Sequence, residues 1–249
     1  MSKFNFMDKL NILLFFISLN LWSQSPIQCD RPDQTETPFT VPKNRFQIES
    51  GFSYKKDVDH HNYSLPSTLS KYGLTENVEL RLITEWNIEN YREEHLSGLQ
   101  PIQLGFKINF CDEKKARPKT SLIAHVVMPK IASADLKANH LGPNFRFTMQ
   151  HTLSEKLSLG YNLGAQWSAD DLRRTWLYTT TLGYSLSESW GCYVEVFGFA
   201  PQFESAHHSF DGGFTCLISD DFMLDLSAGK RIAGVTAEYY TALGVSFRI

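Results

Sequence analysis

Residues 220–232, with the sequence DDFMLDLSAGKRI, and residues 239–249, YYTALGVSFRI, decide the fold of this chain. In both segments apolar residues alternate with polar or small ones, and this period of two is typical of a β-strand. Asp225 and Arg248 lie on the polar sides, and Phe222 and Phe247 on the apolar sides. The pattern fits a soluble β-sandwich. It also fits an outer-membrane barrel, whose strands face lipid on one side and a polar lumen on the other.

The same alternation recurs upstream and predicts ten further strands. Their expected ranges are 45–55, 63–72, 78–86, 102–110, 120–129, 144–152, 157–167, 176–184, 190–200 and 208–218. The connections are alternately short and long, and the strand number is even, as in outer-membrane barrels with short periplasmic turns and longer outer loops. We therefore predict an all-β fold: a single closed antiparallel transmembrane β-barrel of about twelve strands. Closure requires the last strand to pair with the first.

The composition excludes several classes of protein. The chain has 249 residues and a net charge of −3 at pH 7, with a pI near 6.2, so it lacks the positive field that attracts nucleic acid. Its mean hydropathy is −0.27, and no apolar run of about 18 residues follows the N-terminus, which argues against a helical membrane protein. A membrane barrel is still allowed, because only alternate residues of its strands face lipid.

The N-terminus has the features of a secretory signal peptide. Lys3 and Lys9 precede an apolar run at residues 10–19, and the small residue Ser23 follows it. The run is too short for a membrane anchor, which is the alternative interpretation. We assign residues 1–23 to the signal peptide, 24–43 to an extended arm and 44–249 to the barrel. The arm is rich in Pro, Thr and Asp without periodicity, and we expect it to be periplasmic or to plug the lumen.

Aromatic residues lie near the ends of the predicted strands. Such residues form girdles at both membrane interfaces of a barrel, although they also cap the cores of soluble β proteins. The predicted membrane-interface aromatics are Trp86, Trp167, Trp176, Trp190, Tyr239 and Phe247.

The polar faces of the predicted strands collect charged residues of both signs. A closed barrel would direct them into one lumen, where charges must be paired or solvated. Two interpretations stay open: structural ion pairs that hold the barrel, or a wet path for a solute that selects weakly by charge. The candidate lumen residues are Glu49, Glu79, Arg81, Lys107, His125, Arg146, Glu195, Asp211, Asp225 and Arg248.

Catalytic and metal chemistry find little support in the sequence. Two histidine pairs, His60–His61 and His207–His208, lie on or beside predicted outer loops. Imidazoles bind divalent metals, but adjacent histidines on solvated loops usually do not, so we expect no metal and no cofactor. A nucleophilic serine needs a neighbouring histidine. His208 and Ser209 are adjacent on a strand and should point to opposite faces, so we expect no enzyme.

Four cysteines in an exported chain permit disulfides. Cys29 in the arm and Cys111 in a turn are both predicted at the periplasmic end, and a disulfide between them would pin the arm to the rim. Cys192 and Cys216 are predicted opposite each other on neighbouring strands, either as a cross-strand pair or as free thiols.

Three segments resemble the phenol-degradation meta-pathway outer-membrane family. They are DRPDQTETPFTVPKNRFQIESGFSY at residues 30–54, KYGLTENVELRL at residues 71–82 and HHSFDGGFTCLISDDFMLDLSAG at residues 207–229. The resemblance covers nearly the whole chain after the signal peptide. It implies an outer-membrane barrel and suggests transport of small compounds, aromatic ones among them. It implies no catalytic residues.

These observations predict a protein of the Gram-negative outer membrane, surrounded by its lipid and inserted by the barrel-assembly machinery, which recognises a terminal aromatic such as Phe247. The expected function is a transporter or channel for small aromatic or hydrophobic compounds. A non-conducting structural or ligand-binding barrel with a plugged lumen is the first alternative. A soluble secreted β protein is the second.

Overall fold

The computed structural model describes residues 25–234 and 237–249. The predicted signal peptide, residues 1–23, lies outside the described residues. The described chain holds thirteen strands and one short 3₁₀ helix, η1 (Ala134–Leu136). The strands are β1 (Phe46–Lys56), β2 (His60–Thr75), β3 (Val78–Tyr91), β4 (Glu94–Leu99), β5 (Gln103–Cys111), β6 (Lys119–Val127), β7 (Gly142–Thr152), β8 (Leu157–Trp167), β9 (Arg174–Ser185), β10 (Trp190–Pro201), β11 (His207–Ser219), β12 (Phe222–Ala233) and β13 (Tyr239–Arg248).

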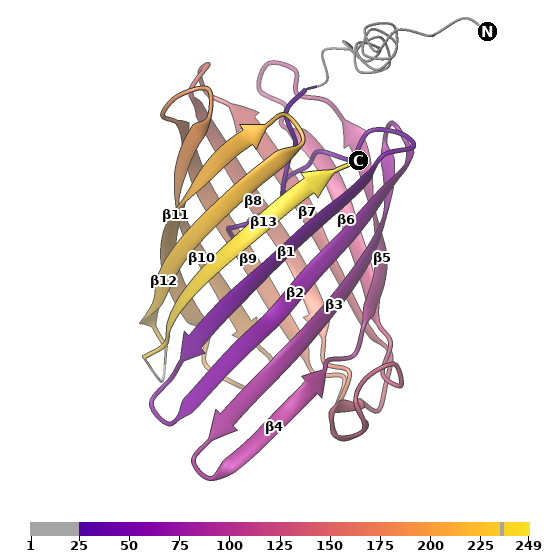
Figure 1. Cartoon of the computed structure of the whole chain (residues 1–249), viewed down its shortest axis with the longest axis vertical. Helices are drawn as coiled ribbons and strands as arrows, with labels where there is room; N and C mark the ends of the chain where they lie inside the picture. Colours follow the sequence, from indigo (N-terminus) through magenta and orange to yellow (C-terminus); the bar gives the residue numbers. More distant parts are fainter. Residues whose placement is uncertain (1–24, 235–236) are drawn as a thin grey trace, which may run out of the picture.

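Twelve of these strands close into an antiparallel barrel (Figure 1). Closure is made by β13 and β1, whose register runs from Gln47 opposite Arg248 to Lys56 opposite Tyr239. Strand β3 pairs with β5, so β4 stands outside the ring as a hairpin extension of β3. The predicted fold and the predicted pairing of the last strand with the first are confirmed.

The thirteenth strand corrects one prediction. Residues 87–98 were expected to form a polar loop, but β3 continues to Tyr91 and β4 returns along it. Most of this hairpin is exposed or half-buried on both faces. It therefore lacks the apolar alternation from which a strand is recognised in sequence.

The two ends of the barrel differ. At one end, which we call the terminal end, the arm begins and β13 finishes, and the connections include residues 76–77, 153–156, 186–189 and 220–221 (Figure 1). The opposite end, the loop end, carries the β3–β4 hairpin and the connections at residues 128–141, 168–173 and 202–206. This asymmetry matches the predicted alternation of short and long connections.

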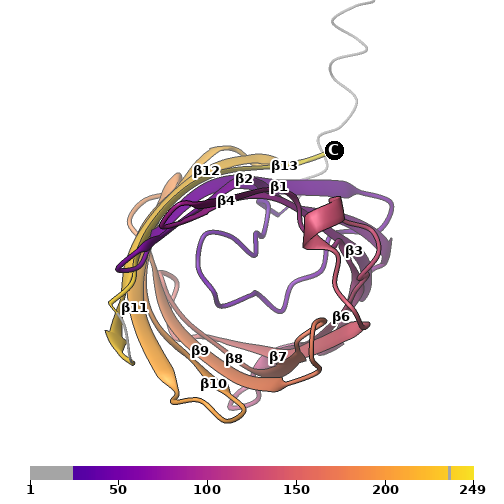
Figure 2. The same ribbon diagram turned by 90° about the horizontal axis from the view of Figure 1, so that it is seen from below.

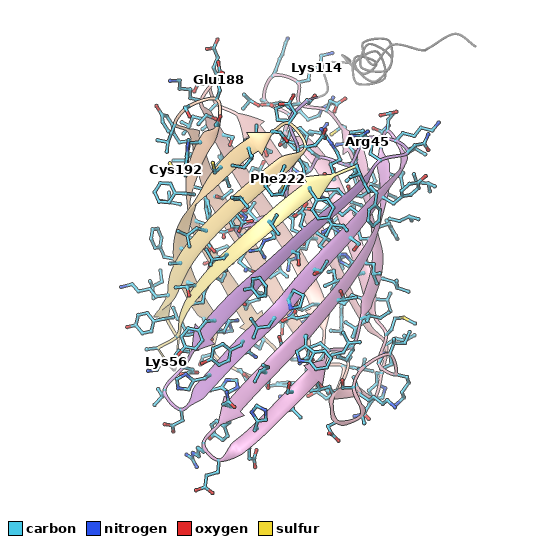
Figure 3. The ribbon with its side chains drawn as sticks, viewed as in Figure 1. Arg45, Lys56, Lys114, Glu188, Cys192 and Phe222 are labelled. Carbon is cyan, nitrogen blue, oxygen red and sulfur yellow. The ribbon has the colours of Figure 1, made fainter. Side chains whose placement is uncertain are left out.

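The outward faces of the strands are apolar and exposed (Figure 3). Phe52, Leu163 and Leu243, for example, are 55–57% exposed. The interior is the reverse, with charged and polar side chains almost fully buried. A barrel that is apolar outside and polar inside has the arrangement required in a bilayer. In residues 25–234 and 237–249, no helix has both the length and the apolar character needed to cross a membrane.

Candidate functional site

The lumen contains the side chains that the sequence assigned to it. Nine of the ten candidate residues are buried inside the barrel, and Arg146 faces the same way with 20% of its side chain exposed. Their common direction follows from the strand period of two, which sends alternate residues to one face. The sequence did not indicate which groups these side chains contact.

The arm crosses the lumen instead of lying outside it (Figure 2). It starts at the β11–β12 turn and β13, where the Ile27 amide donates to the Asp220 carbonyl and Arg248 donates to the Ser25 carbonyl. It then passes the inner face of the barrel and returns to β1, where the Asn44 amide donates to the Gly73 carbonyl. The arm therefore forms a loop inside the barrel.

Asp30 is the most heavily contacted residue of the arm. Its carboxylate is 2.9 Å from Lys107 Nζ, 3.1 Å from Lys71 Nζ and 2.9 Å from an Arg81 guanidinium nitrogen. All four side chains are at most 3% exposed. Burial raises the pKa of Asp30, but the charges of Lys107, Lys71 and Arg81 outweigh it and hold that pKa well below its usual range. Asp30 is therefore a buried carboxylate.

The arm supplies the negative charge that the wall of the barrel lacks at this place. Four cations gather here, Lys71, Arg81, Lys107 and Arg146, while the wall itself contributes two carboxylates, Glu49 and Glu79. The two missing charges come from the arm, as Asp30 and as Glu36, which pairs with Arg81 and Arg146. Buried cations without partners are costly, so the wall favours the docked arm.

Arg31 makes the reciprocal contact, from the arm to a carboxylate of the wall, beside the closing seam. Its guanidinium forms a two-pronged contact with Asp225 of β12, with distances of 3.0 and 3.3 Å. The side chain runs over Gly51 and Gly244, where a Cβ atom would overlap it. These two glycines on β1 and β13 make room for the arm next to the closing seam.

Hydrogen bonds hold the middle of the arm. Glu195 of β10 accepts from the Gln34 amide at 2.7 Å and from the Thr35 hydroxyl at 2.5 Å. The Thr35 hydroxyl also lies 2.6 Å from that of Thr179 on β9. Asn162 of β8 accepts from the Glu36 amide at 2.8 Å and donates to its carbonyl at 3.0 Å. The arm thus contacts strands on several sides of the barrel.

An acidic side of the lumen faces the middle of the arm. Glu195 lies directly opposite Asp211 in the β10–β11 ladder, and the Tyr240 hydroxyl donates to Asp211. The arm adds a third carboxyl, Asp33. Burial raises the pKa of Asp33 well above its usual range, and the charges of Glu195 and Asp211 add to the effect. No ion pair with a cation is found for these three carboxyls among the described residues.

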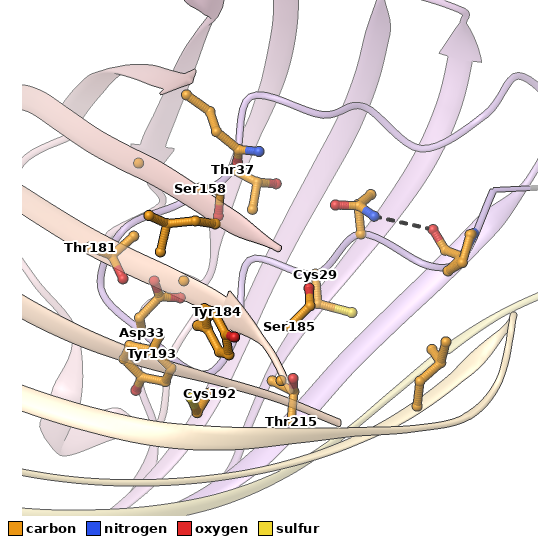
Figure 4. A pocket seen from close by; sticks show the side chains of 18 of the residues that line it. Cys29, Asp33, Thr37, Ser158, Thr181, Tyr184, Ser185, Cys192, Tyr193 and Thr215 are labelled. Carbon is orange, nitrogen blue, oxygen red and sulfur yellow. Dashed lines mark hydrogen bonds between the residues drawn. The ribbon is translucent and has the colours of Figure 1, made fainter. Parts of the chain in front are cut away.

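The arm separates two cavities. The terminal-end cavity has a volume of about 510 Å³ and lies between the arm and the ends of β7–β11. Figure 4 shows Asp33 and Tyr193 at one side of it and Cys29 further along the arm. The loop-end cavity has a volume of about 420 Å³ and opens toward β1–β3 and β10–β13. Arg31 and Pro32 line both cavities.

The loop-end cavity has two different walls. One wall is aromatic: Phe199 meets Phe197 edge to face and His207 at a tilt, with ring centroids 6.0 and 5.5 Å apart. The other wall is polar and includes Ser64 and Glu85, whose side chains are hydrogen-bonded to each other. A cavity of this kind offers both a stacking surface and hydrogen-bond partners to a small solute.

The predicted interface aromatics lie at both ends of the barrel. Trp86, Trp176, Trp190 and Tyr239 are 44–58% exposed, whereas Trp167 and Phe247 are half-buried. Trp190 and Phe247 lie at the terminal end, and the other four lie toward the loop end.

The structure corrects both cysteine predictions. Cys29 and Cys111 are free thiols, so the predicted disulfide between them is not formed. Cys29 packs with Ile27 and Met223 near the barrel seam, while the Cys111 thiol donates to the Pro118 carbonyl in the β5–β6 turn. Cys192 and Cys216 are also free thiols, which was one of the two predicted alternatives, but they are not opposite each other, because Cys192 pairs with Phe214 and Cys216 with Trp190.

Each histidine of the two pairs contacts an aromatic ring. In the described parts of the chain, no group of three or more His, Cys, Asp and Glu side chains is arranged to hold a metal ion. His208 contacts Tyr178 on the outside of the barrel, while Ser209 is buried inside it. The two neighbours therefore point to opposite faces, as a strand requires.

Residues 29–249 match the family described as "Putative MetA-pathway of phenol degradation". The chain belongs to this family. The matched range covers the barrel and the part of the arm from Cys29 onward. No curated protein matches the chain.

Solved structures of outer-membrane channels share the fold. An outer membrane channel from Pseudomonas putida F1 is 12% identical and has a TM-score of 0.69, with 89% of this chain and 100% of that chain covered. The NanC porin is 9% identical with a TM-score of 0.58, and the KdgM porin in complex with disordered oligogalacturonate is 8% identical with a TM-score of 0.55. For both porins, 80% of this chain and 98% of the porin chain are covered.

Proposed function

We propose that this protein is a channel of the Gram-negative outer membrane that carries small aromatic or hydrophobic compounds and is closed by its own arm. Residues 1–23 direct its export, and the barrel-assembly machinery inserts it. The terminal end faces the periplasm and the loop end faces outward, which is the usual orientation of short turns and long loops. The protein has no enzymatic role in this proposal.

The observation that carries the proposal is the polar character of the contact between the arm and the wall. The arm is held by ion pairs from Asp30, Arg31 and Glu36 and by hydrogen bonds from Gln34 and Thr35. Water can replace polar contacts of this kind when the arm moves, and the four wall cations then face a hydrated lumen. An apolar plug would resist that exchange.

The two walls of the loop-end cavity support an aromatic substrate. A ring can stack on Phe199 while a hydroxyl or carboxyl group reaches the polar wall near Ser64. The family description refers to phenol degradation, and the likeness to channels and porins supports a transport role. The lumen residues that the sequence assigned, from Glu49 to Arg248, line the proposed solute path.

A growth experiment tests this function. A deletion strain is grown on aromatic compounds at limiting concentration and is complemented with the wild type, Phe199→Ala or Phe210→Ala. Phe199 lines the cavity, whereas Phe210 is 42% exposed on the outward face and serves as the matched control. We expect the wild type and Phe210→Ala to restore growth fully, and Phe199→Ala to restore it less. Equal growth of the deletion strain and the wild type on every compound would contradict the proposal.

The arm contacts also favour a second candidate function, a non-conducting barrel that binds a ligand above a permanent plug. Under this alternative the purified protein binds the aromatic compound, but deletion leaves its uptake unchanged. Measuring binding and uptake with the same compound distinguishes the two functions.

A further inference from the structure

An apolar groove lies on the outward face of the barrel near the loop end. Its volume is about 500 Å³, and it is lined mainly by Phe145, Phe147, Leu163, Trp176, Tyr178 and Ala200. The groove exists because small residues interrupt the outward rows of large ones. Ala165 faces both Phe145 and Trp176 across the ladders, and Ala200 faces Trp176 from the other side.

Two of the polar side chains that line this groove bind each other. Tyr178 and His208 lie on either side of Gly198, and the Tyr178 hydroxyl is 2.9 Å from His208 Nδ1. A Cβ atom at Gly198 would come within 2.6 Å of both rings. The pair closes one end of the groove, and its tyrosine hydroxyl and one histidine ring nitrogen are bound to each other. Most of the remaining lining is apolar, so the groove suits a hydrocarbon chain.

A cation stands at the loop-end side of the groove. Arg174 lies opposite Trp167 in the β8–β9 ladder, and its guanidinium carbon is 4.8 Å from the centroid of the Trp176 ring. Arg174 forms no ion pair with any residue in the described part of the chain. Its neighbour Arg173, by contrast, pairs with Asp171 and Glu204. Arg174 is therefore available for an anion from outside the protein.

The groove and the arginine have the geometry of a lipid site. In a barrel that spans a membrane, the outward groove lies at the depth of the acyl chains, and a cation beside the rim tryptophans lies at the level of the headgroups. We propose that they bind one molecule of lipid A, the phosphorylated and acylated lipid of the outer leaflet. One phosphate contacts Arg174, and one acyl chain fills the groove beside Trp176. The inference uses the proposed membrane orientation and is independent of transport.

Native mass spectrometry of the full-length protein in detergent tests this site, with purified lipid A as the probe. Arg174→Gln removes the cation, and Ala200→Phe fills the groove from an exposed position. Lys56→Gln removes an equal charge from an exposed residue at the loop end, on β1 (Figure 3). We expect Arg174→Gln to lower the fraction carrying one lipid A about fivefold, the usual effect of one basic residue near a lipid surface. Ala200→Phe should lower it at least as much, and Lys56→Gln should leave it unchanged.

Heat-dependent migration on a gel verifies that each variant is a folded barrel. Two further probes test which part of the lipid is recognised. Phosphatidylcholine supplies acyl chains with a zwitterionic headgroup, and inorganic phosphate supplies the anion alone. If the protein retains both probes more weakly than lipid A, the proposed site is supported. The inference is overturned if folded Arg174→Gln binds lipid A like the wild type, if Lys56→Gln loses as much, or if phosphatidylcholine is retained as well as lipid A.

Discussion

The arm meets opposite charges on the two sides of the lumen. Asp30 meets three buried cations on the side formed by β2, β3 and β5, whereas Asp33 meets Glu195 and Asp211 on the side formed by β10 and β11. The two aspartates are close in sequence and both are buried, yet one pKa is lowered and the other is raised. The difference lies in the walls that they contact.

This difference indicates which contacts keep the arm in place. The contribution of Asp30 is present above its unperturbed pKa and is lost only as the pH falls through its lowered value. The contribution of Asp33 is present below its unperturbed pKa and is lost as the pH rises through its raised value. The ion pairs of Asp30 therefore stabilise the docked arm at neutral and alkaline pH. The contacts of Asp33 on the acidic side stabilise it less as the pH rises.

Replacing Asp30 should have the largest effect. Asp30→Asn leaves Lys71, Arg81 and Lys107 short of one buried charge, and breaking a buried pair in this way costs about 3–5 kcal/mol. We expect protease cleavage within the arm to become much faster while the barrel stays folded. Unchanged cleavage would show that the ion pairs do not hold the arm.

The pH dependence tests the acidic side. We expect the amide of Gln34, which donates to Glu195, to lose protection from hydrogen exchange as the pH rises through the raised pKa of Asp33, because Asp33 then ionises beside Glu195 and Asp211. The amide of Val41 is the internal control, since it donates to Glu79 on the cationic side. Protection factors corrected for base catalysis give the comparison. Parallel loss at both amides would remove the distinction between the two sides.

The hydroxyl of Thr35 should matter less than the charge of Asp30. Thr35→Val removes the hydrogen bonds to Glu195 and Thr179 and should destabilise the docked arm by about 1 kcal/mol. Thr40→Val is the matched control, because its hydroxyl binds the Glu76 carbonyl at an exposed site. Cleavage rates in the arm compare the two variants, and a larger effect of the control would speak against a role for Thr35.

Replacing Asp33 should have the smallest effect, and in the stabilising direction. Asp33→Asn keeps the shape of the side chain and removes a charge that burial and Glu195 disfavour. We expect slower cleavage of the arm at pH values above the raised pKa of Asp33 and little change below it. Loosening comparable to that of Asp30→Asn would contradict the contrast between the two aspartates.

The sequence predicted the barrel better than its contents. Alternation with a period of two placed residues such as Glu79 and Asp225 inside the barrel. In a strand, the face of one side chain fixes the faces of all the others. The arm has no hydrophobic period, so its contacts could not be predicted from the sequence. The one available signal was the pair of inward-facing glycines, Gly51 and Gly244, over which Arg31 passes. The predicted pairing of Cys192 with Cys216 was wrong for another reason. An error of one residue in the centre of a hairpin shifts the cross-strand pairing by two residues.

The central claim is that the docked arm closes the lumen, and conductance in planar bilayers tests it most directly. The double variant Asp30→Asn with Glu36→Gln removes both arm charges from the cationic side. Adding Thr35→Cys and Thr179→Cys, in a background without the native cysteines, allows a cross-link where the two hydroxyls are 2.6 Å apart. We predict low conductance for the wild type, higher conductance for the charge variant, closure on cross-linking and reopening on reduction. Equal conductance before and after reduction, or a charge variant that conducts no better than the wild type, would contradict the claim.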